Sequence, residues 1–112
     1  MSLPDETLRK VLNELQNRLA EHKRQLSNVK AQITVKEREK RLAELTKKEL
    51  SALDKDTKTY KSVGKAFIKT DKSVLDKEQD DKIAKNSSDL VTLDNTKKYL
   101  ERNINDLLKD VH

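Results

Sequence analysis

Apolar residues recur at alternating intervals of four and three along the first third of the chain. The series has one polar interruption, and its members are Leu8, Leu12, Leu15, Leu19, His22, Leu26, Val29 and Ile33. This spacing is the heptad seam of a helix that packs against another helix. Pro4 suits a first helical turn, and the two acidic residues that follow favour the positive end of the helix dipole. The pattern predicts one helix over residues 5–44, about 60 Å long.

The apolar series changes beyond Ile33. The same phase reaches Lys36 and Lys40 there instead of apolar residues. The apolar residues of this segment follow another phase and are Ala31, Val35, Leu42 and Leu45. Because no glycine or proline interrupts the segment, we expect an unbroken helix whose apolar seam shifts phase.

A second series of the same kind occupies the last third of the chain. Its members are Ile83, Asn86, Leu90, Leu93, Lys97, Leu100, Ile104, Leu107 and Val111. Thr70, Asp71 or Ser73 is suited to cap the start of such a helix, and Ser73 is followed by Asp76 three residues later. The pattern predicts a second helix over residues 72–110.

The two seams match when the helices run antiparallel. In one register Leu8 lies opposite Val111, and the polar His22 lies opposite the polar Lys97, so that apolar residues face apolar residues. A slip of one heptad stays open, because the pattern repeats every seven residues. We expect an intrachain antiparallel coiled coil in which His22 has a structural role and is not a metal ligand.

The segment over residues 45–71 differs from both helices. Thr46 and Glu49 have the spacing of a capping box, which predicts a short helix through Leu53 that ends near Asp54. Residues 57–60 and 66–68 favour strands, and Gly64 favours a turn between them. Continuous helix is the alternative, since one glycine only weakens a helix. The predicted fold is therefore mainly α: a long antiparallel two-helix coiled coil with a single β-hairpin between the helices, in one domain over residues 1–112.

The expected hairpin has no partner strand within the chain. A two-stranded hairpin is marginally stable in water, and its open edges invite pairing with other chains. We therefore expect it to dock into a sheet or barrel shared with other subunits. The residues expected to make this contact are Tyr60, Val63, Gly64, Phe67 and Ile68.

Composition supports helices that bury only narrow seams. Charged residues make up 40% of the 112 residues and hydrophobic residues 33%, which is too few for an ordinary core. Disorder is the first alternative, but the chain has one glycine and one proline. The net charge of +5 comes from acidic and basic residues that are interspersed, which favours solvated helix faces over nucleic-acid binding.

Several classes of protein find no support in the sequence. There is no cysteine for a disulfide or thiolate metal site, and no apolar run resembles a signal peptide or a membrane span. We expect an intracellular protein. No phosphate loop, nucleophile set or metal spacing is present, so we expect no enzyme and no cofactor.

The motifs of the central segment resemble those of the prefoldin family, in particular its β-type subunits. The residues that carry the resemblance are Leu45-Thr46-Lys47-Lys48-Glu49-Leu50, Tyr60, Val63-Gly64, Phe67-Ile68 and the second-helix segment over residues 97–107. The resemblance covers nearly the whole chain.

This resemblance implies a heterohexamer of two α-type and four β-type subunits, so that this chain has two α-type and three other β-type partners. Each β-type subunit gives one hairpin to a shared β-barrel from which coiled coils extend. The resemblance further implies ATP-independent capture of unfolded clients, such as actin and tubulin, and their delivery to the cytosolic group II chaperonin. A cytoplasmic location follows, and neither nucleic acid nor a membrane is an expected partner.

Both chain termini of an antiparallel helix pair lie at the end farthest from the insert. More apolar residues occur there than a two-stranded seam needs, and exposed apolar side chains hold other proteins without sequence preference. The expected client-binding residues are Leu3, Leu8, Val11, Leu12, Leu107, Leu108 and Val111. The alternatives are ordinary core with frayed ends and, for the whole protein, a coiled-coil scaffold or adaptor without chaperone activity.

Overall fold

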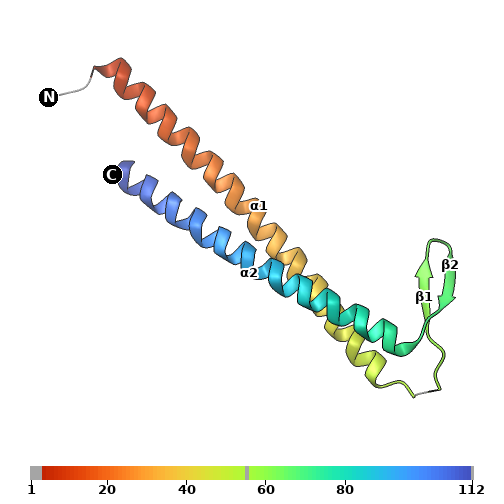
Figure 1. Ribbon diagram of the computed structural model, residues 1–112. Coiled ribbons are helices and arrows are strands. Elements are labelled where there is room, and N and C mark those ends of the chain that lie inside the picture. The colour runs from red at the N-terminus through yellow and green to blue at the C-terminus, as the bar shows by residue number, and fades with distance from the viewer. Residues whose placement is uncertain (1–3, 55, 112) are drawn as a thin grey trace. The chain divides into compact units, whose positions relative to one another are not determined.

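The computed structural model describes residues 4–54 and 56–111, and the side chains of 110 and 111 are outside the description. Helix α1 spans Asp5–Ser51 and helix α2 spans Lys72–Val111. Strands β1, Tyr60–Val63, and β2, Ala66–Lys69, lie between them in the chain (Figure 1). The predicted fold class, two long helices with one β-hairpin between them, is confirmed.

The chain packs into two compact units to which both helices contribute. One unit contains residues 1–34 and 91–112, and the other contains residues 35–90. The two chain ends belong to the first unit and the hairpin belongs to the second.

The first unit buries one stripe of each helix. Val29, Leu100 and Ile104 are buried, whereas the other members of the stripe are half-buried. These half-buried side chains are Leu15, Leu19, His22, Leu26 and Ile33 of α1 and Leu93, Lys97 and Leu107 of α2. Their spacing alternates between four and three, as predicted for both seams. The predicted seam of α1 is wrong at its start, because Leu8 and Leu12 are exposed and the buried stripe begins at Leu15.

The polar interruptions of the first unit find few partners. His22 Nδ1 is buried and has no hydrogen-bond partner among the described residues. Lys97 Nζ lies 3.9 Å from Glu101 Oε1, one turn further along the same helix. A buried polar atom without a hydrogen bond costs stability, so the seam is weakened locally at His22.

In the second unit the seam of α1 keeps the phase that it has before Ile33. Its seam positions from residue 36 onward are held by Lys36, Lys40, Ala43, Lys47 and Leu50. The three lysines are half-buried, whereas Ala43 and Leu50 are buried. The stems of lysine side chains cover apolar surface while their ammonium groups reach water. Lysine therefore occupies seam positions without breaking the heptad.

The predicted change of phase is consequently wrong. Val35 is 50% exposed, Leu42 64% and Leu45 48%, and Ala31 is exposed as well. Helix α1 is continuous, so its buried face keeps the same heptad positions before and after Ile33. These four apolar residues occupy other heptad positions and therefore face solvent.

An ion pair of Lys36 reports the register of the helices in the second unit. The register with Leu8 opposite Val111, continued to this unit, puts Lys36 opposite Ile83. Lys36 Nζ instead lies 3.4 Å from Asp89 Oδ2, six residues further along α2. Its other partner, Glu39 Oε2 at 3.7 Å, is on its own helix.

A second lysine gives the same displacement. The register without a slip puts Lys47 opposite Lys72, a pairing of like charges. The Lys47 ammonium instead donates a hydrogen bond to Asp80 and lies 4.0 Å from Asp76 Oδ2. Both partners lie further along α2, as for Lys36, so the ion pairs of this unit favour the register that is slipped by one heptad.

The short helix expected from the capping box does not form. Thr46 Oγ1 donates to the Leu42 carbonyl oxygen at 2.8 Å, as a threonine inside a helix does, and α1 continues to Ser51. A side chain caps a helix only where the helix begins, at a residue with a non-helical backbone. No glycine or proline precedes Thr46 in α1, so the backbone is helical there and no new helix begins. Two further backbone hydrogen bonds close the C-terminal end of α1. They run from Ala52 N to Glu49 O and from Leu53 N to Leu50 O, each 3.2 Å.

The hairpin is closed by a two-residue loop, Gly64-Lys65. The antiparallel register pairs Tyr60 with Lys69 and Val63 with Ala66. Gly64 has φ of 62°, and no other described residue has a positive φ. Glycine with positive φ at the first loop position is the arrangement of a type II′ turn, whose twist matches that of the strands. The hairpin and its glycine turn are as predicted.

Of the three candidate caps for the second helix, Asp71 is the residue directly before α2. Its carbonyl oxygen accepts hydrogen bonds from Val74 N at 3.0 Å and from Leu75 N at 3.1 Å. A residue that precedes the helix while its carbonyl accepts the first bonds occupies the N-cap position.

The register is open to a direct test, because the chain has no cysteine of its own. Ala43→Cys combined with Ile83→Cys will form a disulfide on oxidation, since the slipped register places these positions opposite each other within the reach of a disulfide. Ala43→Cys combined with Asp76→Cys, the pair opposite in the register without a slip, will stay reduced. Non-reducing electrophoresis with a free-thiol count distinguishes the two. A disulfide in the second variant alone would overturn the slipped register.

Candidate functional site

The β-hairpin presents apolar side chains on both of its faces. Successive residues of a strand point to opposite faces, so the observed register assigns each side chain to one face. One face carries Tyr60, Ser62, Phe67 and Lys69, and the other carries Lys61, Val63, Ala66 and Ile68. The first face therefore combines two aromatic side chains with one lysine, and the second combines three aliphatic side chains with one lysine.

Neither face of the hairpin is covered by the rest of the described chain. Tyr60 is 56% exposed and Phe67 73% on the first face, while Val63 is 50% and Ile68 52% exposed on the second. The described sheet has only these two strands, so the outer edge of each strand lacks a partner. Two strands without a covered face are marginally stable in water, so this surface is suited to contact with another chain.

The base of the hairpin is fastened to its own unit. Thr70 N donates to Thr59 O at 2.9 Å, and Thr59 Oγ1 donates to the Thr70 carbonyl oxygen. Lys61 Nζ lies 2.8 Å from Glu78 Oε1 of α2. These bonds fix where the strands leave the helices and leave the apolar side chains free for contact.

The ion pairs of Lys47 lie near the end of α1 that leads to the hairpin. The hydrogen bond to the Asp80 carboxylate raises the pKa of the Lys47 ammonium above its usual value, and the charge of Asp76 adds to this effect. Lys72 Nζ donates to the Leu53 carbonyl oxygen at 3.1 Å and links the start of α2 to the segment after α1. The helix ends beside the hairpin are therefore held together by polar contacts.

A second uncovered apolar surface lies at the start of α1. Every residue from 4 to 14 is exposed, and the first turns of α1 extend past the end of α2 (Figure 1). Leu8 is 44% exposed, Val11 40% and Leu12 41%. These three side chains fit the predicted apolar surface at the helix ends.

The other residues expected at the helix ends are placed differently. Leu107 and Leu108 are half-buried, so their apolar surface is largely shared with the helix pair. Leu3 and the side chain of Val111 lie outside the described residues. The exposed part of this surface is thus formed by α1.

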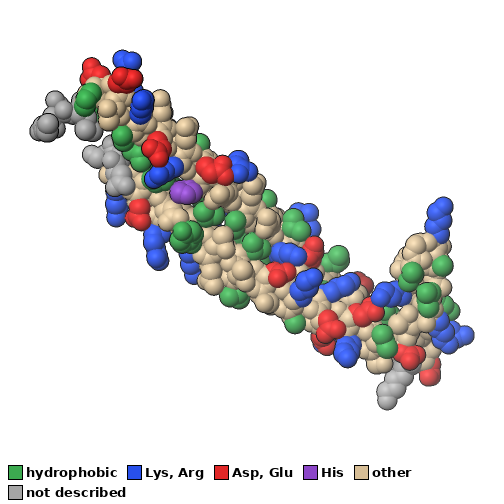
Figure 2. All heavy atoms as spheres, turned by 45° about the horizontal axis from the view of Figure 1, so that its top comes forward, with side chains coloured by type: hydrophobic (Ala, Val, Ile, Leu, Met, Phe, Trp, Pro, Cys, Tyr) green, Lys and Arg blue, Asp and Glu red, His purple; other side chains and the backbone are tan. Residues whose placement is uncertain are grey.

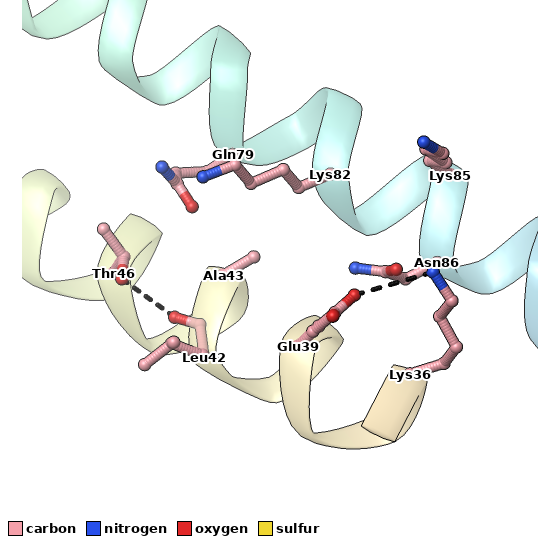
Figure 3. A pocket seen from close by; sticks show the side chains of 9 residues that line it. All are labelled: Lys36, Glu39, Leu42, Ala43, Thr46, Gln79, Lys82, Lys85 and Asn86. Carbon is pink, nitrogen blue, oxygen red and sulfur yellow. Dashed lines mark hydrogen bonds and ion pairs between the residues drawn. The ribbon is translucent and has the colours of Figure 1, made fainter. Parts of the chain in front are cut away.

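An open notch of about 370 Å³ lies beside the seam of the second unit (Figure 3). It is lined by Lys36, Glu39, Leu42, Ala43, Thr46, Gln79, Lys82, Lys85 and Asn86. Ala43 is small, and Asn86 of α2, which also lines the notch, is only 5% exposed. A small residue paired with polar neighbours leaves room in the seam, so we interpret the notch as a packing gap.

A third uncovered apolar group, on the second half of α1, was misassigned by the sequence analysis. Val35, Leu42 and Leu45 were expected in the seam but are exposed in the second unit. Leu53, shortly after the end of α1, is also 39% exposed. The signal was present as an apolar series outside the heptad phase. Such a series indicates a surface for another chain once the seam is known to continue.

The described residues include no group of three or more histidine, cysteine, aspartate or glutamate side chains placed to hold a metal ion. Within the same residues, no helix is both long enough and apolar enough to cross a bilayer. The exposed apolar residues of the hairpin and of the α1 end therefore remain as the candidate interaction surfaces.

Comparison with known proteins agrees with this arrangement. A family model described as Prefoldin subunit matches residues 13–112. The chain belongs to the prefoldin subunit family. Prefoldin subunit 1 of Arabidopsis thaliana is 34% identical over 102 residues, which cover 91% of this chain and 80% of that protein. Probable prefoldin subunit 1 of Schizosaccharomyces pombe is 30% identical over 94 residues, 84% of each chain.

The fold has a counterpart among solved structures. The crystal structure of the prefoldin beta subunit from Thermococcus strain KS-1 superposes with a TM-score of 0.83 over 98% of this chain and 92% of that one, at 24% identity. This likeness supports the fold. The predicted resemblance to the prefoldin family is confirmed by the family match and by these relatives. Prefoldin subunits are chaperone subunits that assemble with other prefoldin subunits.

Substitution of the turn glycine will test how far assembly depends on the hairpin. Gly64→Val forces a β-branched residue to a φ of 62°, where an L-residue costs about 1–2 kcal/mol or more. No atom lies within 4 Å of the added Cβ, so strain in the backbone, not collision, is the cause. Assembly with other prefoldin subunits will fall in size-exclusion chromatography, while helical circular dichroism stays unchanged.

Gly64→Asn is the matched control, because asparagine tolerates the left-handed conformation far better than valine. It will retain most of the assembly. Equal assembly by Gly64→Val and the wild-type chain would show that the hairpin turn does not matter for complex formation.

Proposed function

We propose that the chain is one β-type subunit of an ATP-independent chaperone heterohexamer, in which it acts as a single domain beside two α-type and three other β-type subunits. The complex captures unfolded client proteins of the actin and tubulin class and delivers them to the cytosolic group II chaperonin. This places it in the cytoplasm and requires no cofactor. The observation that carries the proposal is a hairpin that exposes apolar side chains on both faces in a member of the prefoldin family.

The hairpin serves assembly in this proposal. Tyr60, Val63, Phe67 and Ile68 contact strands of neighbouring subunits, and Gly64 keeps the turn tight. Burial of each large apolar side chain contributes about 1.5–3 kcal/mol relative to full exposure. Because these four are only half to three-quarters exposed in the single chain, docking recovers part of that amount from each.

The end of α1 serves client binding. Leu8, Val11 and Leu12 are exposed on a helix end that extends past α2 (Figure 1). With Leu3, Leu107, Leu108 and Val111 they form the proposed client surface. Each contact is weak and without sequence preference, and several subunits in one complex raise the effective concentration of such surfaces.

Removal of apolar surface at this end will separate client binding from assembly. A variant with Leu8→Ser, Val11→Ser and Leu12→Ser, or deletion of residues 1–9 and 107–112, will leave hexamer formation intact. It will weaken suppression of the aggregation of denatured actin several-fold, because the exposed apolar area is lost. Light scattering of the client and the mass of the complex are the two measurements.

Val91→Ser with Tyr99→Ser is the control, since both side chains are 62% exposed in the same unit but far from the first turns of α1 in the sequence. This variant will suppress aggregation like the wild-type complex. Undiminished suppression by the Leu8, Val11 and Leu12 variant would remove the client assignment. A wild-type complex without any suppression would favour the scaffold or adaptor alternative.

A further inference from the structure

The positive charge of the chain is concentrated around the hairpin. Residues 57–70 contain four lysines, Lys58, Lys61, Lys65 and Lys69, and no aspartate or glutamate. The whole chain has a net charge of +5, so this one short segment carries four of the excess charges. Elsewhere acidic and basic residues are nearly balanced, which makes the hairpin electrostatically distinct from the helices.

The four lysines surround the hairpin on all sides. Lys58 precedes β1 and Lys65 lies in the loop, while Lys61 and Lys69 point to opposite faces. All four are exposed, and Figure 2 shows a basic side chain at the hairpin tip beyond the apolar ones along its length. Any chain that covers either face or either edge must therefore approach a lysine.

One of these lysines is neutralised by a partner among the described residues. Lys61 forms the ion pair with Glu78. Lys58, Lys65 and Lys69 have no ion pair among the described residues. Three exposed positive charges are thus available to an approaching chain.

This charge pattern discriminates between possible strand partners. Like charges opposite each other on neighbouring strands destabilise the pair, and opposite charges stabilise it. Two copies of this hairpin joined at their edges bring lysines together without a single acidic residue of the segment to compensate. Lysines on an edge strand commonly prevent such self-pairing.

We propose that the hairpin selects, as its neighbour in the shared sheet, a strand of another prefoldin subunit that carries acidic side chains facing Lys58, Lys65 and Lys69. Apolar contacts by Val63, Phe67 and Ile68 supply the burial, and the lysines decide which subunit is accepted. This inference rests on the proposed function and adds the chemistry of the partner to it.

Single-stranded nucleic acid is the other class of ligand with matching charge, since Tyr60 and Phe67 are exposed among lysines. The structure favours a protein strand for two reasons. The face with Lys61 carries aliphatic Val63, Ala66 and Ile68, which do not stack on bases, and both strand edges offer unpaired backbone groups.

Charge reversal tests the selection. The variant Lys58→Glu, Lys65→Glu, Lys69→Glu is mixed with the other prefoldin subunits, co-expressed and purified without this chain, and its incorporation is followed by fluorescence. In about 50 mM NaCl it will associate about tenfold more slowly than the wild-type chain. The difference will shrink in about 500 mM NaCl, where the screening length is only a few ångströms.

Two matched variants separate charge from position. Lys58→Gln, Lys65→Gln, Lys69→Gln removes the charges without reversing them, and its rate will lie between those of the wild type and the Glu variant. Lys10→Glu, Lys23→Glu, Lys30→Glu changes the net charge equally at exposed positions of α1, and its rate will stay close to that of the wild type.

Zero-length cross-linking of the assembled complex identifies the partner. A carbodiimide joins an amine to a carboxylate only when the two are in contact, so Lys58, Lys65 or Lys69 will be found linked to acidic residues in strands of one neighbouring subunit. Mass spectrometry of the peptides locates these links.

The outcomes distinguish this inference from the function on which it rests. A wild-type chain that does not enter the complex contradicts the proposed function itself. If the wild type enters and the Glu variant enters at the same rate, the inference is overturned and the function stands. Tight binding of a fluorescent single-stranded oligonucleotide by the wild-type chain, lost in the Glu variant, would also overturn it in favour of nucleic acid.

Discussion

The structure depends on a hairpin that does not cover its own apolar side chains. Each strand has four residues and one neighbour, so half of the backbone groups that a sheet pairs are left at its edges. Both faces carry large apolar side chains, and the rest of the described chain covers neither face. The bonds at Thr59, Thr70 and Lys61 hold the base in place, while the apolar side chains of both strands stay exposed.

The helices are under a different constraint: they must pack along a seam that contains few apolar residues in the second unit. Leucine, valine and isoleucine fill most seam positions in the first unit, whereas three lysines and an alanine fill most α1 positions in the second. Lysine stems protect the seam, and their ammonium groups reach acidic residues of α2, as Lys36 and Lys47 do. The pattern of buried positions is thus regular although the residues that occupy it are not.

Local sequence patterns were sufficient to predict the helices and the hairpin. They were insufficient to predict the register in which the two helices pack. The heptads, the hairpin and the turn at Gly64 follow from short-range rules that act within a few residues. The register does not, because every heptad offers the same match and only cross-helix partners such as Lys36 and Asp89 distinguish them. The cap predicted at Thr46 was wrong for a related reason. The capping-box motif marks a position where a helix can begin, but a new helix begins there only if the preceding helix ends, and α1 continues to Ser51.

The exposed apolar surfaces were likewise predictable from the sequence only in part. Exposure of the hairpin was predictable, because no other strand exists in the sequence to cover it. Exposure of Leu42 and Leu45 was not, because an apolar series on a helix fits an inward and an outward face equally well until the seam is located. Once the seam is known, groups of uncovered apolar residues are found at the hairpin, along α1 and at its first turns, beside single exposed residues of α2 such as Val91 and Tyr99. A chain that is 40% charged and yet has three such surfaces is built to be completed by other chains.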